Sequence, residues 1–384
     1  MQEQASLWRS SAMRALVGVT VLGFASYCLT LASLPAYAVQ GGAEESTAGI
    51  VTAVLLTVTI AVQAVVPALT ARFGQARVLV AGLVALGAPS PLYAVDDGLV
   101  WLSALSAVRG AGFAVLTVLG ATLAAQVAPV ERRGEAIGIY GLAIAIPNLV
   151  AVPAGVALVL DGHPTWLAVL AASPLLGLVF VPALVRAMPP AAPRGPAGSG
   201  RAAALAAVAP SVVLLVVTLA GGGLVTFLPI ERPDGALATA ALLLFGLFGA
   251  ISRWRAGLLA DRWGSRLLMP LALLVGAVGL VVVAVGLGSG DPWVLIGAAV
   301  FGAGFGAIQN LTLLSAFARA GEGGTTSASA MWNASFDAGT AAGALGLGLV
   351  AAGIGLDWTY VLSAALLVAA LPVASAATRA AVRS

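Results

Sequence analysis

Residues 257–288 read GLLADRWGSRLLMPLALLVGAVGLVVVAVGLG, a short charged stretch followed by a long apolar one. The part after Arg266 carries no charge and is long enough to cross the hydrocarbon core of a bilayer, which takes about 20 helical residues. Because lipid offers no hydrogen-bond partners to the backbone, such a run predicts a transmembrane helix. The charged stretch predicts the connection from the preceding helix.

Similar apolar runs follow one another along the whole chain. Of its 384 residues, 60% are hydrophobic and 9% are charged, whereas soluble domains carry roughly 25% charged residues. This composition excludes an ordinary water-soluble domain and indicates the lipid bilayer as the surroundings of the chain. We expect twelve transmembrane helices, at about 13–38, 47–70, 78–95, 99–127, 136–160, 166–186, 205–230, 236–252, 267–288, 293–318, 327–353 and 358–378.

The arginines predict the orientation of these helices. The chain has 18 arginines and no lysine, and all but Arg109 and Arg232 lie at the termini or in even-numbered connections. Since positive residues gather on the cytoplasmic side, we expect a multi-pass protein of a bacterial inner membrane with both termini cytoplasmic. The arginines form no single basic face with exposed aromatic residues, which argues against nucleic acid as a partner.

An internal repeat divides the chain into two halves. RFG at 72–74 recurs as RWG at 262–264, and GAGF at 110–113 recurs at 302–305. The two offsets are 190 and 192 residues, which indicates a duplication. The longest connection is rich in Pro, Gly and Ala and predicts a flexible cytoplasmic linker. We therefore expect an N-terminal six-helix half at 1–186, the linker at 187–204 and a C-terminal six-helix half at 205–384.

The charged stretch at 257–266 resembles the signature connection of the major facilitator superfamily, G-x-L-A-D-R-x-G-R-R, with Ser265 in place of the first closing arginine. The resemblance covers the whole chain. It implies an all-α membrane protein with the major facilitator fold, whose two pseudo-symmetric six-helix halves alternate between inward-open and outward-open states around a midplane site. Such a protein is a secondary transporter.

The chemistry of this stretch predicts a latch at the cytoplasmic edge. Gly257 permits close helix approach, and Gly264 allows a tight turn. Asp261 can accept hydrogen bonds from a neighbouring helix N-terminus or pair with an arginine. The alternative is that the arginines only set the topology. In the first-half copy Pro67 and Ala71 replace the glycine and the aspartate, so a latch is expected in the second half alone. Its residues are Gly257, Asp261, Arg262, Gly264 and Arg266.

Two charged residues lie deep within predicted helices. Arg109, in helix 4, begins a sequence similar to the R-x-x-x-G motif that the superfamily associates with proton coupling; alternatively, it binds buried carbonyl groups and holds helices together. Asp337, in helix 11, shares a helix face with Asn333. It could bind a proton, a cationic substrate or Arg109, or it could be a structural carboxylate between helices.

The remaining candidate residues come from helices 1 and 10. Helix 10 carries Gln309 and Asn310, and helix 1 carries Tyr27. The family architecture implies that helices 1, 4, 7 and 10 line a central cavity, where amide and hydroxyl groups can orient a polar ligand. Such groups also join membrane helices to one another.

No catalytic motif, phosphate-binding loop or metal-ligand cluster occurs in the sequence, and Cys28 is its one cysteine. We expect neither an enzyme nor a cofactor or bound metal. Stretches 221–229, 304–315 and 329–339 resemble bacterial drug and sugar efflux permeases, and 147–155 loosely resembles the exporter motif of the family.

We therefore expect a monomer that exports a small organic molecule, with protons as the coupling ion. The alternatives are an importer or facilitator of a sugar, amino acid or organic acid and, more distantly, a non-transporting membrane receptor.

Overall fold

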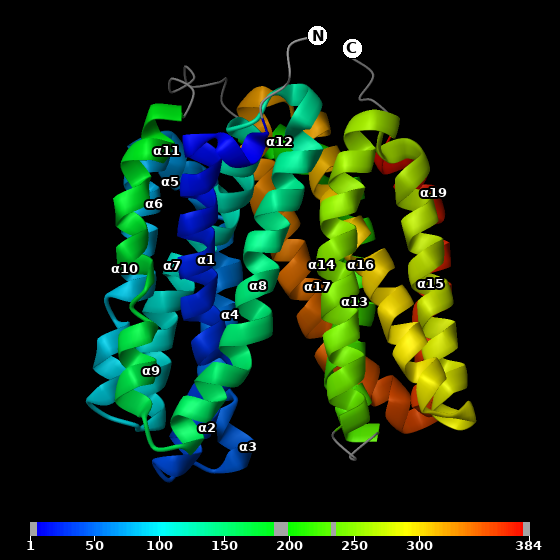
Figure 1. The fold of residues 1–384 in the computed structure, drawn as a ribbon, viewed down its shortest axis with the longest axis horizontal. Coiled ribbons are helices and arrows are strands. Elements are labelled where there is room, and N and C mark those ends of the chain that lie inside the picture. The colour runs from blue at the N-terminus through cyan, green and yellow to red at the C-terminus, as the bar shows by residue number, and fades with distance from the viewer. Residues whose placement is uncertain (1–5, 188–198, 232–235, 379–384) are drawn as a thin grey trace. The chain divides into compact units, whose positions relative to one another are not determined.

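The computed structural model describes residues 6–187, 199–231 and 236–378 (Figure 1). Within these ranges the regular elements are helices, and no strand occurs. Eleven helices there are long and apolar enough to cross a membrane. There are twelve if α4 (Ile50–Gln63) and α5 (Val66–Phe73), which are bent by 54° at their junction, form one span. The predicted class, an all-α membrane protein, is confirmed.

The contacts divide the chain into two compact units. The first unit comprises residues 1–128 and 143–195. Besides α4 and α5, and the later part of α8 (Arg133–Leu160), its helices are α1 (Ser11–Leu31), α2 (Ser33–Gln40), α3 (Glu45–Ala48), α6 (Gln75–Gly87), α7 (Leu99–Gln126), α9 (Pro164–Leu170), α10 (Pro174–Gly177) and α11 (Val181–Ala187).

The second unit comprises residues 129–142 and 196–384, so the first turns of α8 pack with it. The sequence had placed all of residues 1–186 in one half. Most of the predicted linker, 188–198, lies outside the described residues, and Ser199 already begins a helix. Besides the first turns of α8, the helices of this unit are α12 (Ser199–Ala206), α13 (Val208–Glu231), α14 (Ala236–Trp263), α15 (Ser265–Ser289), α16 (Asp291–Ala320), α17 (Thr325–Ile354), α18 (Leu356–Ala369) and α19 (Leu371–Ala377).

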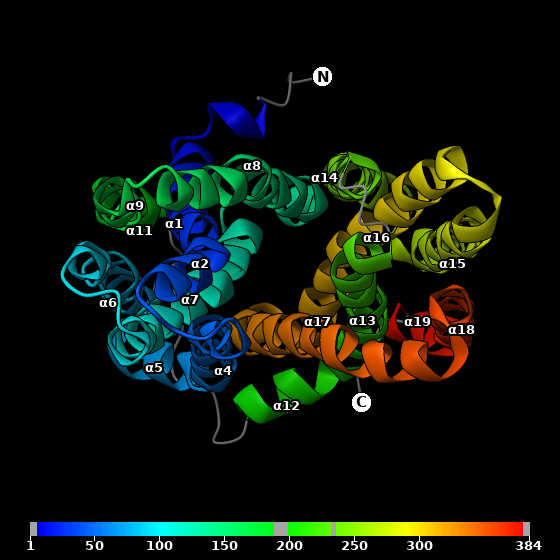
Figure 2. The same ribbon diagram turned by 90° about the horizontal axis from the view of Figure 1, so that it is seen from below.

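The repeated GAGF motif makes equivalent helix contacts in the two units. In the first unit α7 packs against α4 and α6, and in the second α16 packs against α14 and α15 (Figure 2). A Cβ added to Gly110 would collide with the backbone of α4, and one on Gly302 with the backbone of α14. Gly112 and Gly304 face the backbones of α6 and α15 in the same way. Small residues at these positions let the helix backbones approach, which agrees with the predicted duplication.

The other repeated motif, RFG at 72–74 and RWG at 262–264, ends in equivalent turns in the two units. Gly74 joins α5 to α6 with φ 84°, and Gly264 joins α14 to α15 with φ 75°. An L-amino acid with a side chain is disfavoured at these angles, whereas glycine adopts them freely. The expectation that Gly264 allows a tight turn is confirmed.

Candidate functional site

The last turns of helix α14 carry Gly257, Asp261 and Arg262 of the predicted latch, and Gly264 and Arg266 follow at the start of α15. The sequence placed the end of this helix at residue 252, but it continues to Trp263. Arg253, which was assigned to the connection, therefore lies inside the helix, where 7% of its surface is exposed. The apolar pattern ends where the charged residues begin, so the sequence placed the helix end there. The helix itself continues to the glycine that ends it, Gly264.

The Asp261 carboxylate binds the N-terminus of α8. Oδ1 accepts a hydrogen bond from the Gly134 N–H, and Oδ2 accepts one from the Glu135 N–H, each at 2.8 Å. The first N–H groups of a helix have no partner within that helix, and the helix dipole favours negative charge there. Asp261 thus makes the first of the two contacts expected for it, charge-assisted bonds to a helix end.

Glycines let α8 and α14 approach at this contact. A Cβ on Gly257 would overlap the Gly134 carbonyl oxygen, and a Cβ on Gly134 would overlap the Gly257 carbonyl oxygen. Asn310 of α16 joins the same place, because its Nδ2 donates to the Gly134 carbonyl at 3.2 Å and to the Arg253 carbonyl at 3.0 Å. Two of the predicted residue sets, the latch and the helix 10 amides, therefore meet here. Arg262 and Arg266 are exposed beside them.

Arg109 is fully buried in the first unit and ties helices together. Its Nε donates to the Leu86 carbonyl at 3.0 Å. Nη1 donates to Thr30 Oγ1 at 2.9 Å and to the Tyr93 hydroxyl at 3.2 Å. Nη2 donates to the Ser26 carbonyl at 3.1 Å and to Ser26 Oγ at 2.8 Å. All five N–H bonds of the guanidinium thus reach neutral oxygens.

Tyr27 belongs to an aromatic cluster of the first unit. Its ring stacks on Phe113, with centroids 3.9 Å apart and planes 6° apart. Phe24 meets both rings edge-on. The tyrosine is partly exposed.

The remaining predicted residues lie on α16 and α17. Gln309 Oε1 accepts a hydrogen bond from Arg253 Nη1 at 2.8 Å. Asn333 donates back to its own helix, to the Ser329 carbonyl at 2.8 Å. Asp337 follows one turn later and is partly buried. The structure thus brings Gln309 to Arg253 and leaves Asn333 engaged within α17.

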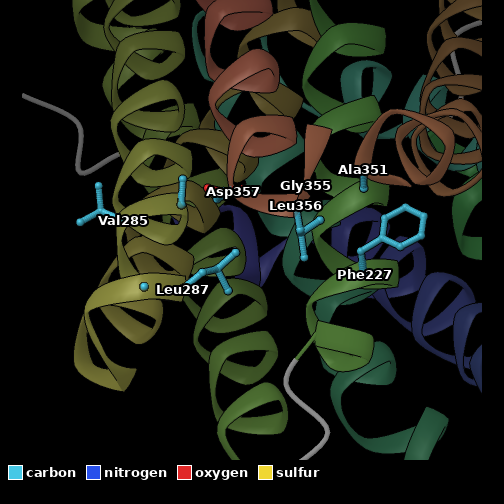
Figure 3. Close-up of a pocket in the computed structure, with 9 residues that line it drawn as sticks. Phe227, Val285, Leu287, Ala351, Gly355, Leu356 and Asp357 are labelled. Atoms are coloured by element: carbon cyan, nitrogen blue, oxygen red, sulfur yellow. The ribbon is translucent and has the colours of Figure 1, made fainter. Parts of the chain in front are cut away.

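A pocket of about 550 Å³ lies near the ends of α13, α15 and α17 (Figure 3). The side chains of Phe227, Val285 and Leu356 are among those that line it. Asp357 is the carboxylate among the described residues that line it. None of the residues predicted from the sequence lines this pocket.

Sequence reasoning missed Arg253 as a candidate site residue. A signal for it existed, because Arg253, Gly257 and Asp261 are spaced four residues apart and therefore share one face if the helix continues. An intramembrane arginine on the face of a predicted contact residue would have marked it as a candidate.

These features define a multi-pass helical membrane protein, with a duplicated bundle and polar groups held inside it, which is the construction of membrane transporters. The family model of the Major Facilitator Superfamily matches residues 15–344. The chain belongs to this superfamily, and the expected family is confirmed. A comparison with curated protein sequences finds no significant match.

Solved transporter structures share the fold. The human organic anion transporter MFSD10 has a TM-score of 0.76 at 15% identity, covering 95% of this chain and 99% of that one. The E. coli fucose:proton symporter has a TM-score of 0.74 at 14% identity, covering 97% and 100%. A proton:xylose symporter bound to a bromodeoxyglucose has a TM-score of 0.71 at 15% identity, covering 94% of both chains. At these identities the likeness concerns the fold alone.

Proposed function

We propose that the chain is a secondary active transporter that exports a small organic molecule in exchange for protons, by alternating access. The observation that carries this proposal is the bond between Asp261 and the N-terminus of α8. A half-buried carboxylate that binds a helix end through two hydrogen bonds can release it, since water and nearby arginines can replace those partners. Such a contact suits a reversible latch.

The latch works by biasing one conformation. While Asp261 holds Gly134 and Glu135, the first turns of α8 stay against α14. Losing the bond removes that stabilisation and lets the helices part. A contact present in one state and absent in the other shifts the equilibrium by its own free energy.

We assign proton coupling to Asp337 and a positioning role to Arg109. Asp337 is a partly buried carboxyl on a predicted transmembrane helix, where protonation removes the cost of a charge. Arg109 donates its N–H groups to residues of α1 and α6 and to Tyr93. These bonds support the alternative in which Arg109 holds helices together. Protonation of Asp337 would then act on helices whose positions Arg109 fixes.

Import is the second candidate, favoured by the names of two structural neighbours. The E. coli fucose:proton symporter and the proton:xylose symporter named above both move a sugar together with protons. In a symporter, substrate and proton move in the same direction, whereas in the proposed exporter they move in opposite directions. A test of direction therefore separates the two.

Purified protein in proteoliposomes tests the proposal directly. A proton gradient of either sign is imposed, and sugars, organic anions and hydrophobic cations are screened for flux. The proposal expects uphill movement against the proton flow, and Asp337→Asn should abolish the uphill movement while exchange survives. Movement with the proton flow would establish the symporter instead, and full uphill transport by Asp337→Asn would remove the assigned role of Asp337.

We also propose a bacterial inner membrane with both termini cytoplasmic, as the arginine distribution indicates. Single cysteines at Arg201, Asp97 and Asp291 in a Cys28→Ser background test this orientation. An impermeant maleimide added to whole cells should label positions 97 and 291 and leave 201 unlabelled. Labelling of all three positions from one side would reject the orientation.

A further inference from the structure

Two arginines are buried among the residues that the structure describes, and they differ in how many of their N–H groups have acceptors. Arg109 gives each of its N–H bonds to an oxygen, as described above. Arg253 has one hydrogen bond, from Nη1 to Gln309 Oε1 at 2.8 Å. Its Nε and Nη2 are buried and have no acceptor among the residues that the structure describes. Burying an arginine in this condition costs far more than burying a paired one.

The two unsatisfied nitrogens form a recognition element. Nε and Nη2 share one edge of the guanidinium, and their N–H bonds on that edge run parallel. This fork matches the two oxygens of a carboxylate, which can accept both bonds at once. Gln309 holds the opposite side of the group through Nη1 and thereby fixes the direction of the edge. The geometry is that of a donor pair without its acceptor.

Aromatic rings lie near the guanidinium group of Arg253. The Trp332 ring is 6.0 Å from the guanidinium carbon of Arg253. Trp332 is fixed by a hydrogen bond from its Nε1 to Thr312 Oγ1 at 3.0 Å, and Phe336 stacks on it at 5.9 Å. A ligand whose carboxylate reaches Arg253 would therefore find apolar ring surface next to its head group.

A glycine makes room for the arginine. A Cβ on Gly141, in the first turns of α8, would lie 2.5 Å from Arg253 Nε and 2.6 Å from its Cδ. The backbone of α8 thus passes close to the open edge. The first turn of α8, before Gly141, is held to α14 by Asp261. Parting of these helices would expose the edge, so the latch controls access to it.

We propose that Arg253 binds the carboxylate of a small organic anion with an apolar or aromatic body, with Gln309 as the positioning residue. This inference rests on the proposed transport function and names the substrate class. The carboxylate accepts from Nε and Nη2 of Arg253, and the body of the ligand packs toward Trp332. Binding supplies the missing acceptor and so removes the cost of the unsatisfied charge.

Benzoate and benzamide are suitable probes because they share a shape and differ in charge. Thermal unfolding of the purified full chain is measured over a concentration series of each, at constant ionic strength. Benzoate should stabilise the wild-type protein and benzamide should not. Arg253→Met should weaken benzoate binding at least tenfold, since a bidentate charge-assisted contact is lost. Arg255→Met removes the same charge from the exposed side of the same helix and should leave benzoate binding unchanged.

Gln309→Glu keeps the test decisive if Arg253→Met does not fold. The new carboxylate would stand where Gln309 Oε1 now accepts from Nη1, and would neutralise Arg253 internally. The unliganded variant should unfold at a higher temperature than the wild type, while its benzoate affinity should fall at least tenfold. If Arg253 had only a structural role, Gln309→Glu would raise the unfolding temperature without lowering the affinity for benzoate.

Three results would overturn the inference: no stabilisation of the wild type by benzoate, equal stabilisation by benzamide, or undiminished benzoate affinity in folded Arg253→Met or Gln309→Glu. None of these results touches the proposed transport function. That function fails separately, if no compound moves under any imposed proton gradient.

Discussion

Replacing Asp261 with asparagine removes the charge from the latch and leaves its shape. The carboxylate accepts two backbone N–H bonds at 2.8 Å. Asparagine has one oxygen, so one N–H would face an amide NH₂ group. A hydrogen bond to a charged group contributes about 1.5–3 kcal/mol, and the charge at a helix N-terminus adds about 0.3–1 kcal/mol. Because Asp261 is only half-buried and water competes, we take the lower end, about 2 kcal/mol, or roughly 30-fold in the latch equilibrium.

The opening can be measured at Ala136, which follows the two N–H donors on α8 and is fully buried. Ala136→Cys in a Cys28→Ser background gives a single reactive thiol. When opening is fast compared with labelling, the rate of reaction with an impermeant maleimide follows the open fraction. We expect Asp261→Asn to raise this rate roughly 30-fold, with unchanged expression.

Asp96→Asn is the matched control for this change. Asp96 Oδ1 also accepts a backbone N–H, from Gly98 at 2.6 Å, but within an exposed turn. The same substitution there should leave labelling at Ala136→Cys unchanged. If Asp261→Asn labels within twofold of its parent, the bond does not hold the helices and the latch is rejected.

Three further substitutions test the other assignments. Arg109→Met removes five hydrogen bonds, worth about 0.6 kcal/mol each between membrane helices, so thermal stability should fall by up to about 3 kcal/mol; an unchanged melting temperature would contradict its positioning role. Gly257→Ala should separate α8 from α14 and raise maleimide access, whereas Gly246→Ala on the same helix meets nothing within 4 Å and should have no effect. Asp337→Asn should lose uphill transport at normal expression, and proportionate loss of expression and transport would indicate a structural carboxylate.

The fold class could be predicted from the sequence because its causes are local. Runs of apolar residues about 20 long must be helical in lipid, and Gly264 was expected to allow a tight turn, where its φ is 75°. The repeated GAGF motif, which recurs at nearly the same offset as the RFG motif, indicated a duplication. These features depend on spacing and residue size, which a sequence displays directly.

The candidate site could be predicted only in part, because its geometry depends on residues far apart in the chain. Asp261 was expected to bind a helix N-terminus or an arginine, but nothing local identified Gly134 as the partner, 127 residues earlier. The charged end of α14 was read as a connection, so Arg253 was missed. Hydropathy cannot distinguish an arginine in a loop from one buried on a helix face. That distinction depends on what the neighbouring helices bring to it.

The two units repeat their glycines but not their charges, and this difference has a physical reason. A glycine between two helix backbones is fixed by the distance between them, so both copies of a bundle need it. A buried charge is required by no packing rule and is retained at a cost. In the first unit, five hydrogen bonds from Arg109 to neutral oxygen atoms offset the cost of burying its charge. In the second, Arg253 offsets it in part, through one hydrogen bond to Gln309 and the nearby Trp332 ring among the described side chains. Loss of the first charge should therefore lower stability, and loss of the second should lower binding.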